Sequence, residues 1–442
     1  MLLNIGLDDI DSVEGGCTTY VASRIVKALV NLGIIFSDYP NLIRLNPNIP
    51  WKTRGNGAVA LRILFEGKNT HNIFSVVCSI IKKHALSDSN PGVVMLRGDV
   101  PNDIVNFSKL AMHTLVTKKK ALTLVRKHDL DSFELGSGLG IIGALSSIGC
   151  TLEEDHTFEV ISYRTQGMWG KRREVNRASI LTMNKKMGHV TFNNIDPETN
   201  RILITPRGPD PVLFGIRGNG AASVLRSKDM VSTGEPFEYM LYRTNQGTGA
   251  HLEHFLNIRE LKPYSSGRID GSISTRTVTM EGGHVMFKIK NQEGEVNCAA
   301  YQQTGSLKER CRALEIGDIV EIGGGVRRAS SRFPRALNLE FLRVLYLKPQ
   351  YQWINPKCNC GRIMESAGHE KGYRCRECGA KNRTGRKEPR EKQRTISTGF
   401  YQPPPRAQRH LTKPMARIGK EKVWNNQKLK AGWYSFKSSD LF

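Results

Sequence analysis

The chain opens with a short apolar segment, Leu2–Leu7, that ends in three carboxylates, Asp8, Asp9 and Asp11. Two glycines and two threonines follow, and a helical pattern of apolar residues begins at about Tyr20. Carboxylates at the end of a strand suit Mg²⁺, and the free N–H groups at the beginning of a helix suit phosphate. This order predicts a magnesium–phosphate site within the first twenty residues. The alternative is that the aspartates cap a turn and lie in solvent.

Length and composition bound the class of protein. With 442 residues the chain is too long for one core, and about three or four domains are expected. It has no apolar run of about 18 residues, so no membrane span is predicted. The N-terminus lacks the basic flank of a signal peptide. Nine cysteines, four of them clustered, indicate a reducing compartment, so we expect a cytoplasmic protein.

Positive charge is concentrated at the C-terminal end. The whole chain carries +24, and residues 351–442 hold 21 Lys and Arg against 7 Asp and Glu, a net charge of +14. A basic end is typical of proteins that bind nucleic acid, and interspersed aromatic residues suit stacking on bases. We therefore expect RNA-binding residues in this tail, namely Arg406, Arg409, His410 and Lys413. A generic solvated tail is the alternative.

Hydrophobic periodicity predicts an α+β region followed by an all-β region. Up to residue 258 we expect helices at 19–32, 70–86, 103–127 and 219–228, and strands at 58–65, 92–96, 157–164, 189–193, 201–205 and 237–243. Such short units suit α+β layers, including a ferredoxin-like module. Further on we expect strands at 267–278, 284–290, 295–300, 318–326 and 336–345, with a helix at 306–314. One helix after the third of five strands is the layout of an OB-fold, and another small barrel is the alternative.

Glycine-rich segments mark candidate anion sites. Lys52 and Arg54 precede Gly55, Asn56 and Gly57; two cations beside flexible backbone suit phosphate, although Asn-Gly also predicts a plain hairpin turn. The sequence Arg-Gly-Asn-Gly-Ala recurs at 217–221, before a helix rather than a strand, so it is not a structural repeat.

A third glycine run, Gly138–Gly143, matches GxGxxG and leads into an apolar helix. No buried strand precedes it, so nicotinamide cofactors are not expected. We predict instead that this loop packs against the catalytic site.

Four cysteines form two pairs, Cys358-x-Cys360 and Cys375-x-x-Cys378. Glycine follows the second cysteine of each pair, where a knuckle turns, so the pattern predicts structural zinc held by four thiolates. The first pair has one intervening residue where two are usual, which strains that turn. His369 is a less favoured substitute ligand.

Thr18 and Thr19 lie just before the first predicted helix. Residue chemistry alone favours an N-cap, because threonine is a common capping residue. The functional alternative is a hydroxyl that binds Mg²⁺ or accepts a phosphoryl group.

Longer blocks of sequence resemble the archaeal tRNA-isoleucine 2-agmatinylcytidine synthetases along the whole chain. The matching blocks are Gly6–Ser12, Cys17–Tyr20, Leu42–Pro47, Pro50–Ala58, Gly140–Leu145, Pro211–Gly218, Gly282–Val285, the two cysteine pairs and Arg409–Pro414. Two departures stand out: the shortened first cysteine pair, and a tail from about 420 to 442 with no counterpart.

The resemblance implies an enzyme that uses ATP, Mg²⁺ and agmatine to modify the wobble cytidine of the isoleucine tRNA with a CAU anticodon. Carbon 2 of the cytosine would be activated through phosphorylation of its oxygen and then attacked by agmatine, which enables decoding of AUA. Asp8, Asp9 and Asp11 would hold Mg²⁺, Thr18 would accept a phosphoryl group, and Lys52 and Arg54–Gly57 would hold ATP phosphates. The basic tail would grip the tRNA at a distance from the anticodon. Neither a protein partner nor a membrane is implied.

The resemblance also implies a multidomain α+β organisation. We expect a kinase-like domain at 1–63 and 129–190, a ferredoxin-like region at 64–128 and 191–258, an OB-fold at 259–348, a zinc ribbon at 349–384 and a basic RNA-binding tail at 385–442. Agmatine, a dication, needs carboxylates or carbonyl groups, and the candidate segment contains Asp210, Arg217 and Gly218.

Two other functions remain open at this point. One is a non-catalytic single-strand binder built on the OB-fold and the ribbon, with a degenerate N-terminal domain. The other is a small-molecule kinase whose basic end binds RNA incidentally.

Overall fold

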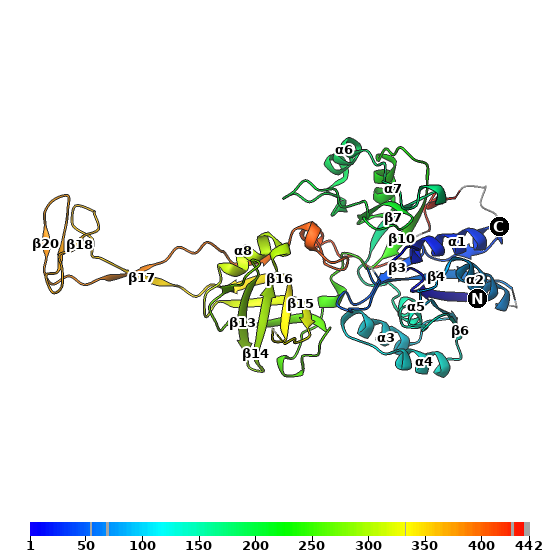
Figure 1. Ribbon diagram of the computed structural model, residues 1–442, viewed down its shortest axis with the longest axis horizontal. Helices are drawn as coiled ribbons and strands as arrows, with labels where there is room; N and C mark the ends of the chain where they lie inside the picture. Colours follow the sequence, from blue (N-terminus) through cyan, green and yellow to red (C-terminus); the bar gives the residue numbers. More distant parts are fainter. Residues whose placement is uncertain (54, 68–69, 332, 426–427, 437–442) are drawn as a thin grey trace.

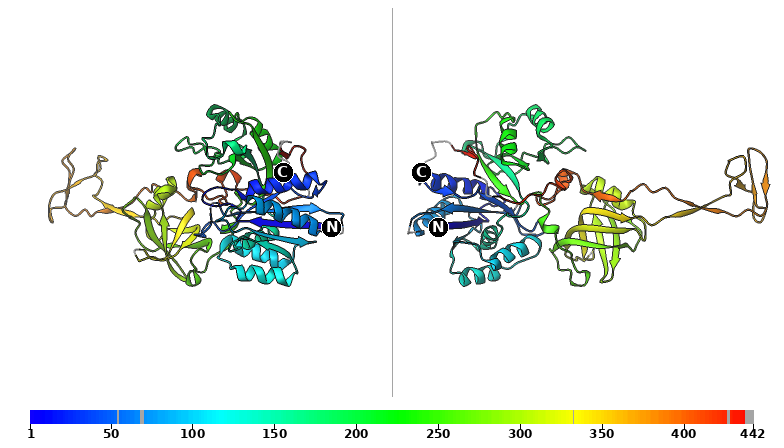
Figure 2. Two further views of the ribbon diagram at one scale, coloured as in Figure 1. Left: turned by 45° about the vertical axis from the view of Figure 1, so that its right-hand side comes forward. Right: turned by 180° about the vertical axis from the view of Figure 1, so that it is seen from behind.

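The computed structural model describes residues 1–53, 55–67, 70–331, 333–425 and 428–436. The molecule is elongated, with an α/β body at one end, a β-barrel in the middle and a slender arm at the other end (Figure 1). The arm extends away from the barrel in two further views as well (Figure 2). The predicted change from an α+β region to an all-β region is therefore confirmed.

The body is built on one eleven-stranded sheet with the order β6-β5-β1-β4-β3-β10-β7-β9-β8, in which β2 also pairs with β4 and β23 (Tyr434–Ser435) with β10. Its first half contains β1 (Leu2–Asp8), α1 (Thr18–Asn31), β2 (Ile35–Phe36), β3 (Asn41–Arg44), β4 (Gly57–Leu64), α2 (His71–His84), β5 (Gly92–Arg97), α3 (Asn102–His113), α4 (Lys118–Lys127), β6 (Asp131–Glu134) and α5 (Gly140–Gly149). Its second half contains β7 (Thr157–Arg164), α6 (Arg177–Met187), β8 (Thr191–Phe192), β9 (Val212–Gly218), α7 (Ala221–Asp229) and β10 (Phe237–Thr244). The halves meet where β3 and β10 pair in parallel.

Strand β1 lies inside the first half of the sheet, between β4 and β5, and it is covered on both faces. Its five inner residues are all buried, as expected for a continuous apolar run. Helix α1 directs Val21, Ile25 and Leu29 into the same core. Helix α5 packs directly against β1, which ends at Asp8. The carboxylate run therefore begins where a rigid, fully packed strand stops.

Several predicted elements differ from the observed ones. The single helix expected at 103–127 is wrong: it divides into α3 and α4, because the Thr117 side chain accepts a hydrogen bond from the Lys120 N–H and starts a new helix. The strand expected at 201–205 is also wrong, since only Ile202 there forms an isolated bridge. Strand 157–164 has the predicted bounds.

Strands also group differently from the predicted domains. Residues 64–128 were expected to join residues 191–258, yet β5 pairs with β1 and β6 in the first half. Strand β7, expected to belong with the N-terminal strands, pairs with β9 and β10 in the second half. The first half is therefore built from residues 2–149 and the second from residues 157–244, to which the tail adds β23.

The barrel comprises β11 (Ser266–Ile273), β12 (Val278–Thr279), β13 (Val285–Asn291), β14 (Gly294–Ala300), α8 (Ser306–Arg312), β15 (Ile319–Arg327) and β16 (Ala336–Tyr346). The order β11-β15-β16-β14-β13 closes through pairing of β11 with β13. Strands β14 and β16 are parallel. The five predicted strands and their helix are present and enclose their own apolar core, although the first strand ends at Ile273 and not at 278, where the separate strand β12 begins.

The arm begins as a two-stranded ribbon of β17 (Tyr351–Ile354) and β21 (Glu388–Glu391) and ends in a small sheet of β18 (Glu365–Ser366), β19 (Tyr373–Arg374) and β20 (Lys381–Asn382). The chain then returns along the barrel, where β22 (Gly399–Tyr401) pairs with β16. It finally reaches the body, where β23 pairs with β10 and Trp433 is buried in the core. The described parts of the tail thus pack against the barrel and the body.

Candidate functional site

A cavity of about 450 Å³ in the body collects residues from both halves of the sheet. The sequence-predicted residues that line it are Asp8, Asp9, Asp11, Thr18, Lys52, Gly55, Asn56, Gly57, Asp210, Arg217 and His410. Gly218, also predicted, belongs to β9 and does not line the cavity. Arg54 lies outside the described residues. Below, this cavity is called the central pocket.

Three carboxylates form one wall of the central pocket. Burial and the neighbouring acids raise the pKa of Asp8 well above its ordinary value, and burial together with Asp11 raises the pKa of Asp9 to about 6. Asp9 has a φ of 58°, a left-handed conformation that is strained for a residue with a side chain. Raised acid pKa values and backbone strain at one place are typical of functional sites.

Thr18 faces these carboxylates. Its hydroxyl donates a hydrogen bond to Asp11 over 3.2 Å and accepts one from the Ile10 N–H over 3.4 Å. The residue that caps α1 is Cys17, and Thr18 is already helical. The N-cap interpretation of Thr18 is therefore wrong, and its hydroxyl lies beside the acidic wall.

The glycine run at 138–143 allows α5 to lie against the acidic wall. A Cβ on Gly143 would be 1.8 Å from the Asp8 carboxylate, and one on Gly140 would be 2.6 Å from the Asp8 carbonyl oxygen. Leu139, Ile142 and Gly143 line the central pocket. The prediction that this loop packs against the site is confirmed.

Another part of the lining is cationic. Arg44, Arg217 and His410 form this cationic wall, and Arg44 together with Arg217 lowers the pKa of the His410 imidazole well below its ordinary value. Glu159 also lines the pocket, and one of its carboxylate oxygens lies 3.6 Å from Arg217. Lys52 lines the pocket but donates to the carbonyl oxygens of Pro47 and Ile49, at 2.7 and 3.0 Å.

Sequence reasoning missed Arg44 and Glu159. Arg44 stands at the end of β3, and Glu159 lies inside β7, between the apolar residues Phe158 and Val160. The available signal was a charged residue within or at the end of a buried-type strand, since such residues are seldom buried without a partner.

The tail residues predicted to bind RNA have contacts within the protein. Arg406 forms ion pairs with Asp196 and Glu198, at 2.6 and 2.7 Å, and Lys413 pairs with Glu421 at 2.8 Å. His410 reaches the central pocket, because Gly247 and Gly249 donate to the carbonyl oxygens of His410 and Leu411. Arg409 is exposed. The tail at His410 is therefore part of the pocket wall rather than distant from it.

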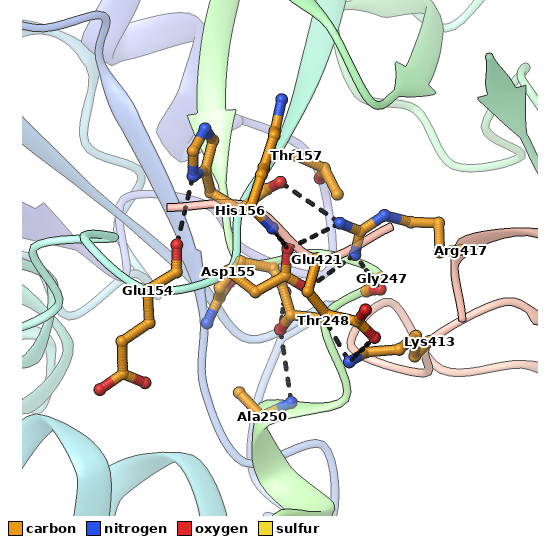
Figure 3. A network of polar contacts seen from close by, with 12 residues as sticks. Glu154, Asp155, His156, Thr157, Gly247, Thr248, Ala250, Lys413, Arg417 and Glu421 are labelled. Carbon is orange, nitrogen blue, oxygen red and sulfur yellow. Dashed lines mark hydrogen bonds and ion pairs between the residues drawn. The ribbon is translucent and has the colours of Figure 1, made fainter. Parts of the chain in front are cut away.

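Arg417 anchors this segment to the body (Figure 3). Its guanidinium is buried and donates to both oxygens of Asp155, at 2.8 and 3.0 Å, and to the Gly247 carbonyl oxygen at 2.6 Å. It also donates to the Asn219 side chain at 2.8 Å, which belongs to the second Arg-Gly-Asn-Gly sequence. That sequence thus holds the tail in place.

The four cysteines converge at the tip of the arm. Their sulfur atoms all lie within 4.8 Å of one another, with Cys358 and Cys378 separated by 3.4 Å and Cys360 and Cys375 by 3.5 Å. Four thiolates at this spacing fit tetrahedral zinc, so the single residue between Cys358 and Cys360 does not prevent convergence. Among the described residues, this is the one group of three or more candidate ligands that converges so closely. Every helix in the described ranges is too short or too polar to span a bilayer.

An α/β body with an acid-lined pocket, a β-barrel and a four-cysteine ribbon on an arm define a multidomain protein with a C-terminal zinc ribbon. Family models agree: the TiaS TCKD domain matches residues 4–73, the TiaS FLD domain residues 138–251 and the TiaS C-terminal zinc ribbon domain residues 355–396. The chain belongs to the TiaS family.

Curated relatives and solved structures share nearly the full length. The 2-agmatinylcytidine synthetase TiaS of Cenarchaeum symbiosum, named for its isoleucine tRNA substrate, is 40% identical over 95% of this chain and 93% of its own. The TiaS of Methanocaldococcus jannaschii is 34% identical over 95% of this chain and 99% of its own. The crystal structure of apo TiaS superposes with a TM-score of 0.87 at 34% identity, covering 94% of this chain and 98% of that one.

Proposed function

We propose that this protein uses ATP and agmatine to convert the wobble cytidine of the CAU-anticodon isoleucine tRNA into 2-agmatinylcytidine. Its curated relatives carry that activity in their name. Two solved TiaS structures with TM-scores of 0.83 and 0.80 to this chain contain the isoleucine tRNA, the first together with ATP and the second with AMPCPP and agmatine. Membership of the family over nearly the whole chain supports the same substrates here.

The observation that carries the proposal is the central pocket, which is lined by both acidic and cationic residues. Asp8, Asp9 and Asp11 form its acidic wall beside the Thr18 hydroxyl, and Arg44, Arg217 and His410 form its cationic wall. Phosphoryl transfer is mainly positioning and neutralisation of charge, and a pocket with both walls can supply each. The wobble base would have to leave its stack to enter it.

Each side chain then has a role. Thr18 accepts a phosphoryl group at its hydroxyl, and Asp11, which accepts its hydrogen bond, orients that oxygen. Lys52 and the loop containing Arg54, Gly55, Asn56 and Gly57 contact the ATP phosphates. The carbon-2 oxygen of cytosine is phosphorylated, the agmatine amine attacks carbon 2, and the carbon–oxygen bond breaks as phosphate leaves.

Asp8, Asp9 and Asp11 are the residues that would hold Mg²⁺. The raised pKa values of Asp8 and Asp9 fit this donor set, because a cation would stabilise the neighbouring negative charges that now repel one another. Mg²⁺ bound there supplies charge neutralisation for the phosphates. Since hard cations also take water and phosphate oxygens, the carboxylates need not complete the ligand shell.

Agmatine is assigned to the side of the pocket that contains Asp210. Asp210 is buried, lies 3.4 Å from Arg173 and lines the pocket. Arg217 was predicted in the same group, but a cation repels a dication, so we assign Arg217 to the phosphates instead. Gly218 is assigned no direct contact with agmatine; it belongs to the backbone of β9, the strand that contains Arg217.

Domain roles follow from the topology. The barrel order, with parallel β14 and β16 and a helix after the third main strand, supports an OB-fold that holds single-stranded RNA. We assign kinase-like chemistry to the half of the sheet that contains β1 and a ferredoxin-like role to the half that contains β7. Arg406, Arg409, His410 and Lys413 remain candidates for tRNA contact, His410 at the base itself.

Transfer of labelled agmatine tests the proposal. The zinc-loaded protein with ATP and the CAU-anticodon isoleucine tRNA should place label in the tRNA, and omission of ATP should prevent it. Salt-sensitive RNA binding without ATP turnover would favour the single-strand binder. ATP turnover that tRNA does not stimulate would favour a small-molecule kinase.

A further inference from the structure

A second cavity, of about 600 Å³, lies next to the central pocket. Pro206 lines both cavities. One wall of the second cavity is the loop 170–173, after β7, and the facing wall is the loop 205–209, before β9. We call it the basic cavity, because Lys171, Arg172, Arg173 and Arg207 line it.

The loop 170–173 is hydrogen-bonded to the arginine of a buried ion pair. Arg164, at the end of β7, pairs with Glu235 at 2.8 Å, and both side chains are almost fully buried. The same guanidinium donates to the carbonyl oxygens of Lys171 and Arg172, at 2.8 and 3.0 Å. These hydrogen bonds hold the backbone of the loop and do not involve the side chains of Lys171 and Arg172.

Arg173 fixes the facing loop in the same way. It donates to the carbonyl oxygens of Gly208, Asp210 and Val212, at 2.8, 3.0 and 2.7 Å. Two arginine forks therefore hold the two walls of the basic cavity at a set separation. Arg173 also lies 3.4 Å from Asp210, so this ion pair stands between the two cavities.

Three cations of the basic cavity have no partner of this kind in the part of the chain that the structure describes. Lys171, Arg172 and Arg207 are exposed, and among the described residues no ion pair or side-chain hydrogen bond is recorded for any of them. Like charges that line one cavity repel, so a bound anion would relieve the repulsion. Arginine forks match phosphate geometry bidentately, and lysine adds a point charge.

We propose that the basic cavity binds backbone phosphates of the RNA strand next to the base that enters the central pocket. This inference rests on the proposed function, which makes RNA the substrate. A base drawn out of its stack needs its flanking backbone held, and contacts to phosphates set position without reading sequence. The cavity that shares Pro206 with the central pocket is placed to hold that backbone.

The test is binding of the full-length protein to the CAU-anticodon tRNA and to its anticodon stem-loop at several salt concentrations. Arg172→Glu with Arg207→Glu should weaken both by about tenfold or more and lower the salt slope by about two, one for each phosphate contact. The matched control is Lys83→Glu with Arg126→Glu, which makes the same change of charge at exposed positions of α2 and α4. The control should leave the salt slope for the stem-loop unchanged.

Equal weakening by the control pair would overturn the proposal, since a general loss of positive charge would then suffice. An increased KM for ATP with unchanged RNA binding would also overturn it and assign the cavity to the nucleotide. Thermal melting of each variant excludes unfolding. Because binding is measured without turnover, failure of agmatine transfer by the unmodified protein would not be mistaken for failure of this site.

Discussion

The hydroxyl of Thr18 donates to a carboxylate oxygen of Asp11 over 3.2 Å. The two residues lie on opposite sides of the glycine turn between β1 and α1, so the hydrogen bond closes that turn around the acidic wall. A phosphoryl group on this hydroxyl would lie beside the three aspartates that we propose hold Mg²⁺.

Replacement of Thr18 tests its role as an acceptor. Thr18→Ala should abolish transfer of label from γ-labelled ATP to the protein and reduce agmatine incorporation by at least a hundredfold, because no oxygen remains at that position. Thr18→Ser keeps the hydroxyl and should retain both measurements in part. Labelling of the alanine variant at the unmodified protein's level would refute the assignment.

Asp9→Asn should stabilise the ligand-free protein while abolishing its activity. When folding raises the pKa of an acid, ionisation of that acid destabilises the folded protein. The destabilisation is absent below the pKa of the unfolded state, about 4, and is complete once the pH exceeds the pKa of the folded state. For Asp9 the folded pKa is about 6, so the gain in Tm should be present at pH 8 and absent at pH 4. Addition of Mg²⁺ should raise the Tm of the unmodified protein more than that of the variant.

Gly143→Ala tests the close approach of α5 to β1. Alanine favours a helix over glycine by about 1 kcal/mol, yet its Cβ would be 1.8 Å from the Asp8 carboxylate. We expect agmatine incorporation to fall at least tenfold because Asp8 must move. Gly167→Ala is the matched control, since a Cβ there has no neighbour within 4 Å. Full activity in the Gly143 variant would contradict the packing.

Arg417→Ala should release the tail from the body. Removal of one partner from a buried ion pair leaves the other charge uncompensated, at a cost of about 3–5 kcal/mol. Asp155 would keep only the Lys422 N–H at 3.3 Å and the Lys413 ammonium at 3.9 Å, so we expect a loss at the lower end of that range, and the segment that contains His410 would lose its anchor. Urea denaturation gives the first effect, and increased protease cleavage near residue 410 gives the second. A combined Asp155→Asn and Arg417→Met variant should recover part of the stability.

Local sequence patterns predicted much of the fold. The barrel strands and the bounds of β7 follow from short-range alternation, turns and apolar runs. The acidic wall and the cysteine cluster were also predicted, because their ligands are close in sequence. The division of 103–127 was missed, since an apolar pattern crosses the Thr117 cap without interruption.

Long-range assembly could not be predicted from local patterns. The cationic wall brings Arg44, Arg217 and His410 together from β3, β9 and the tail, and nothing in the local sequence of each indicates the others. The two halves of the sheet are joined by the parallel pairing of β3 with β10, which are about 200 residues apart in the chain. The tail also packs on the body through β23 and on the barrel through β22, and its basic local sequence does not indicate either contact.

Mass analysis of the wobble nucleoside is the most direct test of the proposed function. After incubation of the protein with ATP, agmatine and the CAU-anticodon isoleucine tRNA, the wobble cytidine should gain one agmatine and lose one water. The Asp9→Asn protein, matched in zinc content and tRNA binding, should leave it unchanged. An unmodified cytidine after incubation with the folded, zinc-loaded, unmodified protein would contradict the proposal.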